Sequence, residues 1–174
     1  MNKKEAIEKP RDITYFKLNN MVNIPTDQNE IQLNKDREAV RAYFLEHVNP
    51  NTVFFYTLEE KINYLIEHDY IEEAFIRKYD FKFIKNLFQN LYHKKFRFKS
   101  FMGAYKFYNQ YALKTNDGTK FLERYEDRIA FAALYLGDGD KQLAWNIANE
   151  HINQRLQLAT PTFLNAGKKA RGEL

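Results

Sequence analysis

The sequence contains no cysteine. This absence excludes a disulfide framework, a thiolate zinc site, an iron–sulfur site and a catalytic thiol carried by the chain itself, and it fits a reducing compartment. No run of about 18 apolar residues occurs, so we expect no membrane span. The first residues, MNKKEAIEKPRD, carry charges where a signal peptide needs an apolar stretch. We therefore expect a soluble, cytoplasmic protein.

Several signatures of catalysis and of metal binding are also missing. The patterns G-x-G-x-x-G, G-x-x-x-x-G-K-[ST] and G-x-S-x-G do not occur, which argues against P-loop and acyl-transfer chemistry. His47, His68, His93 and His151 fall on separate predicted elements and show no H-x-H or H-E-x-x-H spacing. We expect solvated or cap-satisfied histidines and no metal site.

What the chain has in abundance is aromatic and charged residues. Its 174 residues include 15 Phe and 12 Tyr, and 44% of them are hydrophobic, which predicts one domain with an aromatic core. The 27 Lys and Arg are interspersed with 23 Asp and Glu, for a net charge of +4. Such a mild basic bias does not indicate a nucleic-acid partner.

The N-terminal part combines a polar start with short apolar runs. Residues 1–12 are expected to be flexible. Apolar residues two apart predict short strands at 14–18 and 22–24, with a third at 31–33 after Pro25. Because an isolated hairpin is marginal in water, this β-hairpin flap is expected to lean on the helices that follow.

The rest of the chain predicts helices. Asp36, Thr57, Asp80, Ser100 and Asp140 are the expected N-caps, and Thr57 opens a capping box. The expected helices run over 36–48, from 57 onward, over 70–79, from 80 onward, over 100–112, from 122 to 136 and over 141–155. Residues 129–136 are apolar on every side, so this helix must be surrounded by protein, with more cover than the chain obviously supplies.

A group of charged residues lies at the start of that apolar helix. Glu123, Glu126 and Asp127 stand beside Arg124 and Arg128. Ion pairs at spacings of three and four along the helix explain these residues without catalysis.

Basic and aromatic residues alternate in KKFRFK at 94–99. Such a pattern can neutralise phosphates and stack bases, which would make a nucleic-acid module. We favour the simpler interpretation that Phe96 and Phe98 pack inward while the cations face water.

The segment Ala159-Thr160-Pro161-Thr162 is the most distinctive local feature. A threonine hydroxyl held by a following proline, beside free backbone amides, can donate hydrogen bonds to a phosphate. An ordinary helix-to-strand connection would have the same spacing, and the residues alone favour that alternative.

Longer stretches of sequence resemble a known family. The matching strings, in order, are NTVFF (51–55), KFRFKSFMGA (95–104), FYNQYALKTND (107–117), LERYEDR (122–128) and ATPTFLNAG (159–167). They are similar to the N-terminal region of the large (alpha) subunit of class Ib ribonucleoside-diphosphate reductase, and the resemblance extends from Ile13 onward.

The resemblance implies a domain organisation. Residues 13–51 would form a partial ATP-cone-like region of short strands plus a helix, and 52–157 a helical bundle. Residues 158–174 would begin the catalytic barrel region as a substrate-phosphate loop. The expected fold is mainly α, without the ten-stranded α/β barrel that follows in the family, and the chain would stop just before the redox-active cysteine.

The resemblance also implies an activity for the assembled enzyme, namely the radical reduction of ribonucleoside diphosphates for DNA synthesis. Thr160 would bind the substrate diphosphate, and this chain would hold no catalytic residue, metal or cofactor. The expected partners are the remaining large-subunit polypeptide, a second large subunit, a glutaredoxin- or thioredoxin-like reductant, and a small (beta) subunit whose dimetal (Mn or Fe) cofactor carries a tyrosyl radical. No nucleic acid or membrane is expected.

Two further interpretations accompany this one. Some family members bind a deoxyadenosine nucleotide near the N-terminus, which makes Phe44, His47 and Asn51 candidate contacts. The alternative to an enzyme part is a free-standing helical interaction module that assembles with the reductase or regulates it without catalysis.

Overall fold

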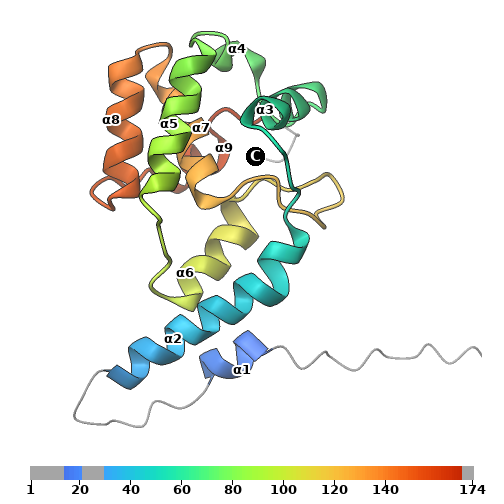
Figure 1. The fold of residues 1–174 in the computed structure, drawn as a ribbon, viewed down its shortest axis with the longest axis vertical. Coiled ribbons are helices and arrows are strands. Elements are labelled where there is room, and N and C mark those ends of the chain that lie inside the picture. The colour runs from blue at the N-terminus through green and yellow to red at the C-terminus, as the bar shows by residue number, and fades with distance from the viewer. Residues whose placement is uncertain (1–13, 21–29, 170–174) are drawn as a thin grey trace, which may run out of the picture. The chain divides into compact units, whose positions relative to one another are not determined.

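The computed structural model describes residues 14–20 and 30–169, and nearly all of its regular structure is helical (Figure 1). Within these ranges there is no β-sheet, only isolated bridges that join Thr52 to Phe121, Lys114 to Phe121 and Ile71 to Lys168. The expectation of a mainly α protein is confirmed. None of the described helices has the length and apolar character needed to cross a membrane.

The chain divides into two compact units. The first comprises the described residues up to Pro50 together with residues 98–105, and the second comprises residues 51–97 and those from Lys106 onward. The first unit contains α1 (Thr14–Asn20), α2 (Glu30–Tyr43), a π helix (Phe44–Val48) and most of α6 (Phe101–Lys106).

The predicted β-hairpin flap is wrong for the described residues. Residues 14–18 lie in α1, and residues 31–33 lie inside α2. The strand expected at 22–24 and the flexible segment 1–12 fall outside the described residues. The helical form of α1 buries Tyr15 edge-on against Tyr43, at 4.9 Å between ring centroids, and against Phe101 at 5.6 Å. Packing of these rings replaces the strand pairing that the apolar pattern suggested.

The second helix also begins earlier than its expected cap. Asp36 lies inside α2, which starts at Glu30. The expected end is confirmed, since the π helix gives way to a short 3₁₀ turn (Asn49–Asn51) that contains Pro50.

The second unit contains the remaining helices. They are α3 (Leu58–Glu67), α4 (Glu73–Ile76), α5 (Phe81–His93), a π helix (Phe107–Tyr111), α7 (Tyr125–Gly137), α8 (Lys141–Ile152) and α9 (Thr160–Asn165). The expected N-caps of α3, α5 and α8 are confirmed. Thr57 accepts a hydrogen bond from the Glu60 amide at 3.0 Å, and Asp80 and Asp140 each accept one from the amide three residues on at 2.9 Å.

Helix α7 is the core of the second unit. It packs against α4, α5, α8 and α9, and residues 129–134 are at most 1% exposed. The expected all-round burial of residues 129–136 is confirmed for 129–134, with cover supplied by the chain itself, but it is wrong at Tyr135, which is 41% exposed. The helix starts at Tyr125 rather than near 122 because Phe121, just before it, bridges to Thr52 and Lys114.

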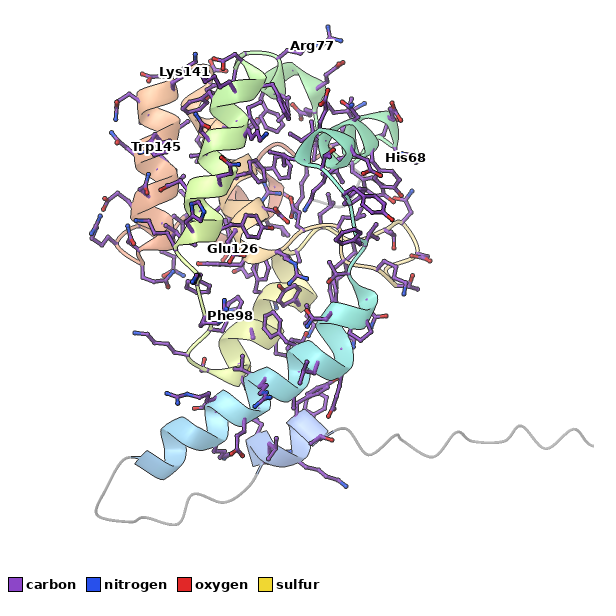
Figure 2. The ribbon with its side chains drawn as sticks, in the orientation of Figure 1. His68, Arg77, Phe98, Glu126, Lys141 and Trp145 are labelled. Atoms are coloured by element: carbon purple, nitrogen blue, oxygen red, sulfur yellow. The ribbon has the colours of Figure 1, made fainter. Side chains whose placement is uncertain are left out.

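The helices α5 and α8 lie side by side (Figure 1). Lys141, at the start of α8 (Figure 2), forms an ion pair with Asp80 and lies 5.9 Å from the centre of the Phe83 ring. These contacts join the N-terminal ends of the two helices at the surface, while α7 holds the middle of the bundle.

Candidate functional site

Thr160 opens the short helix α9. Pro161 occupies its first turn, where a fixed φ and a missing N–H are tolerated. The Thr160 side chain is exposed, and its hydroxyl lies 3.1 Å from the hydroxyl of Tyr111. The segment is therefore a helix start rather than the connection to a strand that the residues alone favoured.

Tyr111 is the last residue of the π helix, which contacts α9. Its ring lies 5.3 Å from that of Phe163 in α9 and is stacked on Phe107 at 6.5 Å. Its backbone carbonyl accepts a hydrogen bond of 2.6 Å from the Lys168 ammonium. Tyr111 thus touches the segment 160–168 through its ring, its hydroxyl and its backbone.

A buried ion pair lies next to this segment. Glu123 and Arg128 are 3.2 Å apart, and neither side chain is exposed. Arg128 also donates to the carbonyl of Ala166, just after α9. Glu123 accepts a hydrogen bond from the Leu113 amide at 3.0 Å and lies 4.0 Å from the Lys168 ammonium. Burial lowers the pKa of Arg128, and the charge of Glu123 opposes this effect in part. The guanidinium stays charged beside the Glu123 carboxylate.

A second buried carboxylate stands at the start of α7. Asp127 accepts hydrogen bonds from the Arg124 amide and the Tyr92 hydroxyl, both at 2.8 Å, and pairs with Lys61. Burial, together with the Asp127 charge, raises the pKa of Tyr92 well above its usual range.

The expected ion pairs within one helix turn are therefore wrong in their partners. Arg128 pairs with a residue five positions away, outside α7, and Asp127 pairs with Lys61 from α3. Sequence spacing missed these pairs because the second partner comes from another element. Glu126, in the first turn of α7 (Figure 2), makes no ion pair within the described part of the chain, and burial raises its pKa.

The histidines behave in different ways. His68 (Figure 2) follows the prediction, since its Nδ1 lies 2.9 Å from the Tyr64 carbonyl at the end of α3. His151 does not, because it is buried against Phe163 at 4.7 Å and its Nδ1 has no hydrogen-bond partner among the residues that the structure describes. Burial lowers the pKa of His151 to about 4. No group of three or more potential metal ligands occurs among the described residues.

The alternating basic segment at 94–99 follows the simpler interpretation. Lys94, Lys95, Arg97 and Lys99 are exposed. Phe96, in the second unit, is half-buried and stacks on Tyr125 at 4.4 Å. Phe98 (Figure 2), in the first unit, is half-buried and lies 6.3 Å from Phe44.

The candidate nucleotide contacts are divided between the units. Phe44 and His47 share the π helix of the first unit, where His47 stacks on Tyr43 at 5.4 Å. Asn51 belongs to the second unit, and its side-chain oxygen lies 3.5 Å from the Lys120 ammonium.

Comparison with known proteins finds two family models that match this chain. Residues 15–96 match the ribonucleotide reductase N-terminal model, and residues 97–171 match the ribonucleotide reductase all-alpha domain. The chain is 54% identical over 160 residues to the ribonucleoside-diphosphate reductase subunit alpha of Bacillus subtilis, which covers 92% of the chain and 23% of that relative. It is 46% identical over 138 residues to the subunit alpha of Mycoplasma pneumoniae, which covers 79% of the chain and 19% of that relative.

The chain thus spans less than a quarter of the length of these relatives. The two matched models follow one another without a gap, and together they cover both units described above. The chain belongs to the ribonucleotide reductase family and corresponds to the N-terminal and all-alpha domains of its large (alpha) subunit.

Proposed function

We propose that this chain forms the helical scaffold and one wall of the substrate pocket of a class Ib ribonucleoside-diphosphate reductase. The assembled enzyme reduces ribonucleoside diphosphates to deoxyribonucleoside diphosphates by radical chemistry. The observation that carries the proposal is the exposed Thr160 hydroxyl at the start of α9, on a segment anchored by the buried Arg128, in a chain 54% identical to reductase alpha subunits.

In this proposal Thr160 binds the diphosphate of the substrate. A phosphate oxygen accepts hydrogen bonds and has no proton to give, so the threonine hydroxyl acts as the donor. The contact holds one end of the substrate while reduction takes place at its ribose. Orienting a substrate in this way lowers the entropic part of the barrier without any chemical step at the threonine.

The redox groups come from other polypeptides. This chain has no cysteine, so the reducing thiols belong to the remaining large-subunit polypeptide. The described residues contain no cluster suited to a metal, and we assign the dimetal tyrosyl-radical cofactor to the small (beta) subunit. A glutaredoxin- or thioredoxin-like protein restores the thiols, and the large subunit works as a homodimer in the cytoplasm.

The test is Thr160→Val in the reductase assembled from this chain, the remaining large-subunit polypeptide and the small subunit. Loss of the hydroxyl should lower kcat/KM for CDP about 5- to 150-fold, because a phosphate oxygen loses its donor. This factor corresponds to a loss of about 1–3 kcal/mol in binding free energy. Thr160→Ser, which keeps the hydroxyl, is the matched control and should stay near the wild type. An unchanged kcat/KM for Thr160→Val would remove Thr160 from the site.

A mixing experiment tests the scaffold role separately. Addition of this chain to the remaining large-subunit polypeptide and the small subunit should restore CDP reduction. If the chain instead changed only the activity of an already complete reductase, it would be a regulatory module rather than part of the enzyme.

A further inference from the structure

We propose that Tyr111 is a positioning residue for Thr160, whose hydroxyl it orients toward the phosphate groups of a nucleoside diphosphate. The inference rests on the proposed function, since it concerns the same threonine. Its starting point is the 3.1 Å separation of the two hydroxyl oxygens, which lie 49 residues apart in the sequence.

The direction of this hydrogen bond decides what Thr160 can do. In the chain as it stands, either hydroxyl could be the donor. When a phosphate binds at Thr160, only one direction remains, because the threonine hydroxyl donates its single proton to a phosphate oxygen. Tyr111 must then donate to the threonine oxygen. The series of hydrogen bonds runs from the tyrosine hydroxyl to the threonine hydroxyl and on to the phosphate. Consecutive hydrogen bonds of this kind polarise and strengthen one another.

Tyr111 is held in place independently of the hydroxyl contact. Lys168 donates to its backbone carbonyl at 2.6 Å, and the same ammonium lies 4.0 Å from the buried Glu123. Its ring packs against both Phe163 and Phe107, at 5.3 and 6.5 Å between ring centroids. The hydroxyl therefore projects from a ring and a backbone that already have partners, and little side-chain freedom remains to be lost on binding.

The partner segment is anchored as well. Arg128 donates to the carbonyl of Ala166, immediately after α9. The next carbonyl, that of Gly167, accepts a hydrogen bond of 2.9 Å from the Glu72 amide. The two segments thus hold one another through the Phe163 and Lys168 contacts, and Arg128 and Glu72 fix the second of them further, so the 3.1 Å spacing of the hydroxyls is set before any ligand arrives. Such preorganisation favours a single orientation of the bound diphosphate.

A double-mutant cycle separates positioning from packing. The variants are Tyr111→Phe, Thr160→Val and the two combined, each in the assembled large subunit. Tyr111→Phe keeps the ring contacts with Phe163 and removes only the hydroxyl. The measurements are the Kd for CDP by titration calorimetry without the small subunit, and KM and kcat for CDP with it. Tyr135→Phe, on the exposed side of α7, is the matched control.

We expect Tyr111→Phe to raise the Kd and KM for CDP by about 2- to 10-fold, the range of one hydrogen bond, with kcat unchanged. In the Thr160→Val background the same change should have no further effect, because the group that Tyr111 orients is already gone. Tyr135→Phe should leave both constants at the wild-type values.

Other results would overturn the inference. An unchanged Kd and KM for Tyr111→Phe, beside a loss for Thr160→Val, would refute positioning by Tyr111 and leave the proposed function standing. Equal losses from Tyr111→Phe in both backgrounds would mean that the tyrosine acts without Thr160. No loss for Thr160→Val would refute the proposed function itself, and with it the role of Tyr111.

Discussion

Arg128 donates to Glu123 across 3.2 Å in a place where neither side chain is exposed to solvent. Removing two charges from water costs several kcal/mol for each ion, and only close pairing and further hydrogen bonds offset this cost. Arg128 finds its further partner in the Ala166 carbonyl, and Glu123 in the Leu113 amide. The pair therefore connects the start of α7 to Leu113, which follows the π helix of Tyr111, and to Ala166, which follows the helix of Thr160.

The first prediction concerns this pair. Arg128→Met should lower the free energy of unfolding by about 3–5 kcal/mol, because Glu123 is left as a buried charge without its main partner. Denaturation by urea, followed by circular dichroism, measures the change. Arg155→Met is the matched control, since its pair with Glu150 is exposed and should matter little. A similar effect of the two substitutions would contradict the importance assigned to the buried pair.

The second prediction concerns pH and His151. Its pKa is about 4 in the folded chain and 6.5 in the unfolded chain, so between these values the unfolded state binds a proton that the folded state does not. Stability must then fall as the pH falls through this window. Between about pH 7 and about pH 5 the loss should be about 2 kcal/mol from this group.

The measurement for His151 is a comparison of two proteins. Burial also raises the pKa of Glu126, so protonation of this carboxylate adds to the pH dependence and the wild type alone is not decisive. In His151→Leu, the loss of unfolding free energy between the two pH values should shrink by about 2 kcal/mol. Parallel pH profiles for the two proteins would show that His151 does not titrate differently on folding.

The third prediction uses two glycines with nearly the same backbone. Gly167 has φ +75° and Gly118 has φ +72°, so alanine is strained at both positions. A Cβ at Gly167 would lie 2.8 Å from the Phe75 ring, whereas one at Gly118 would meet nothing within 4 Å. We expect Gly118→Ala to cost about 1–2 kcal/mol and Gly167→Ala about 1–3 kcal/mol more.

Thermal or urea unfolding of the two variants measures this difference. The backbone strain is common to both, so the excess cost at Gly167 reports the contact with Phe75. Equal costs would mean that the Phe75 ring moves aside freely, and that the turn after α9 is less tightly packed than the structure indicates.

Local signals in the sequence predicted much of the fold. The caps at Thr57, Asp80 and Asp140 are confirmed, because a cap depends on one side chain and an amide three residues away. The burial of residues 129–134 is confirmed for a similar reason, since a helix that is apolar on every side has no face to turn to water.

The prediction of strands near the N-terminus is wrong because the local sequence there suits a strand and a short helix equally well. Residues 14–18 alternate in a way that suits a strand, but their aromatic rings pack equally well from a short helix. Tyr43 and Phe101, both distant in sequence, decide between the two forms by packing against Tyr15. A period of two over five residues carries too little information to outweigh such contacts.

The sequence by itself determined the helical class of the described residues, the N-caps of α3, α5 and α8, and the buried apolar stretch 129–134 within α7. Only the tertiary structure decided which charges pair and what stands beside Thr160. Tyr111 and Arg128 reach the segment 160–167 from 49 and 38 residues away along the chain. Caps and periodicity act over a few residues, whereas these contacts exist only after α9 has packed against both α7 and the π helix Phe107–Tyr111.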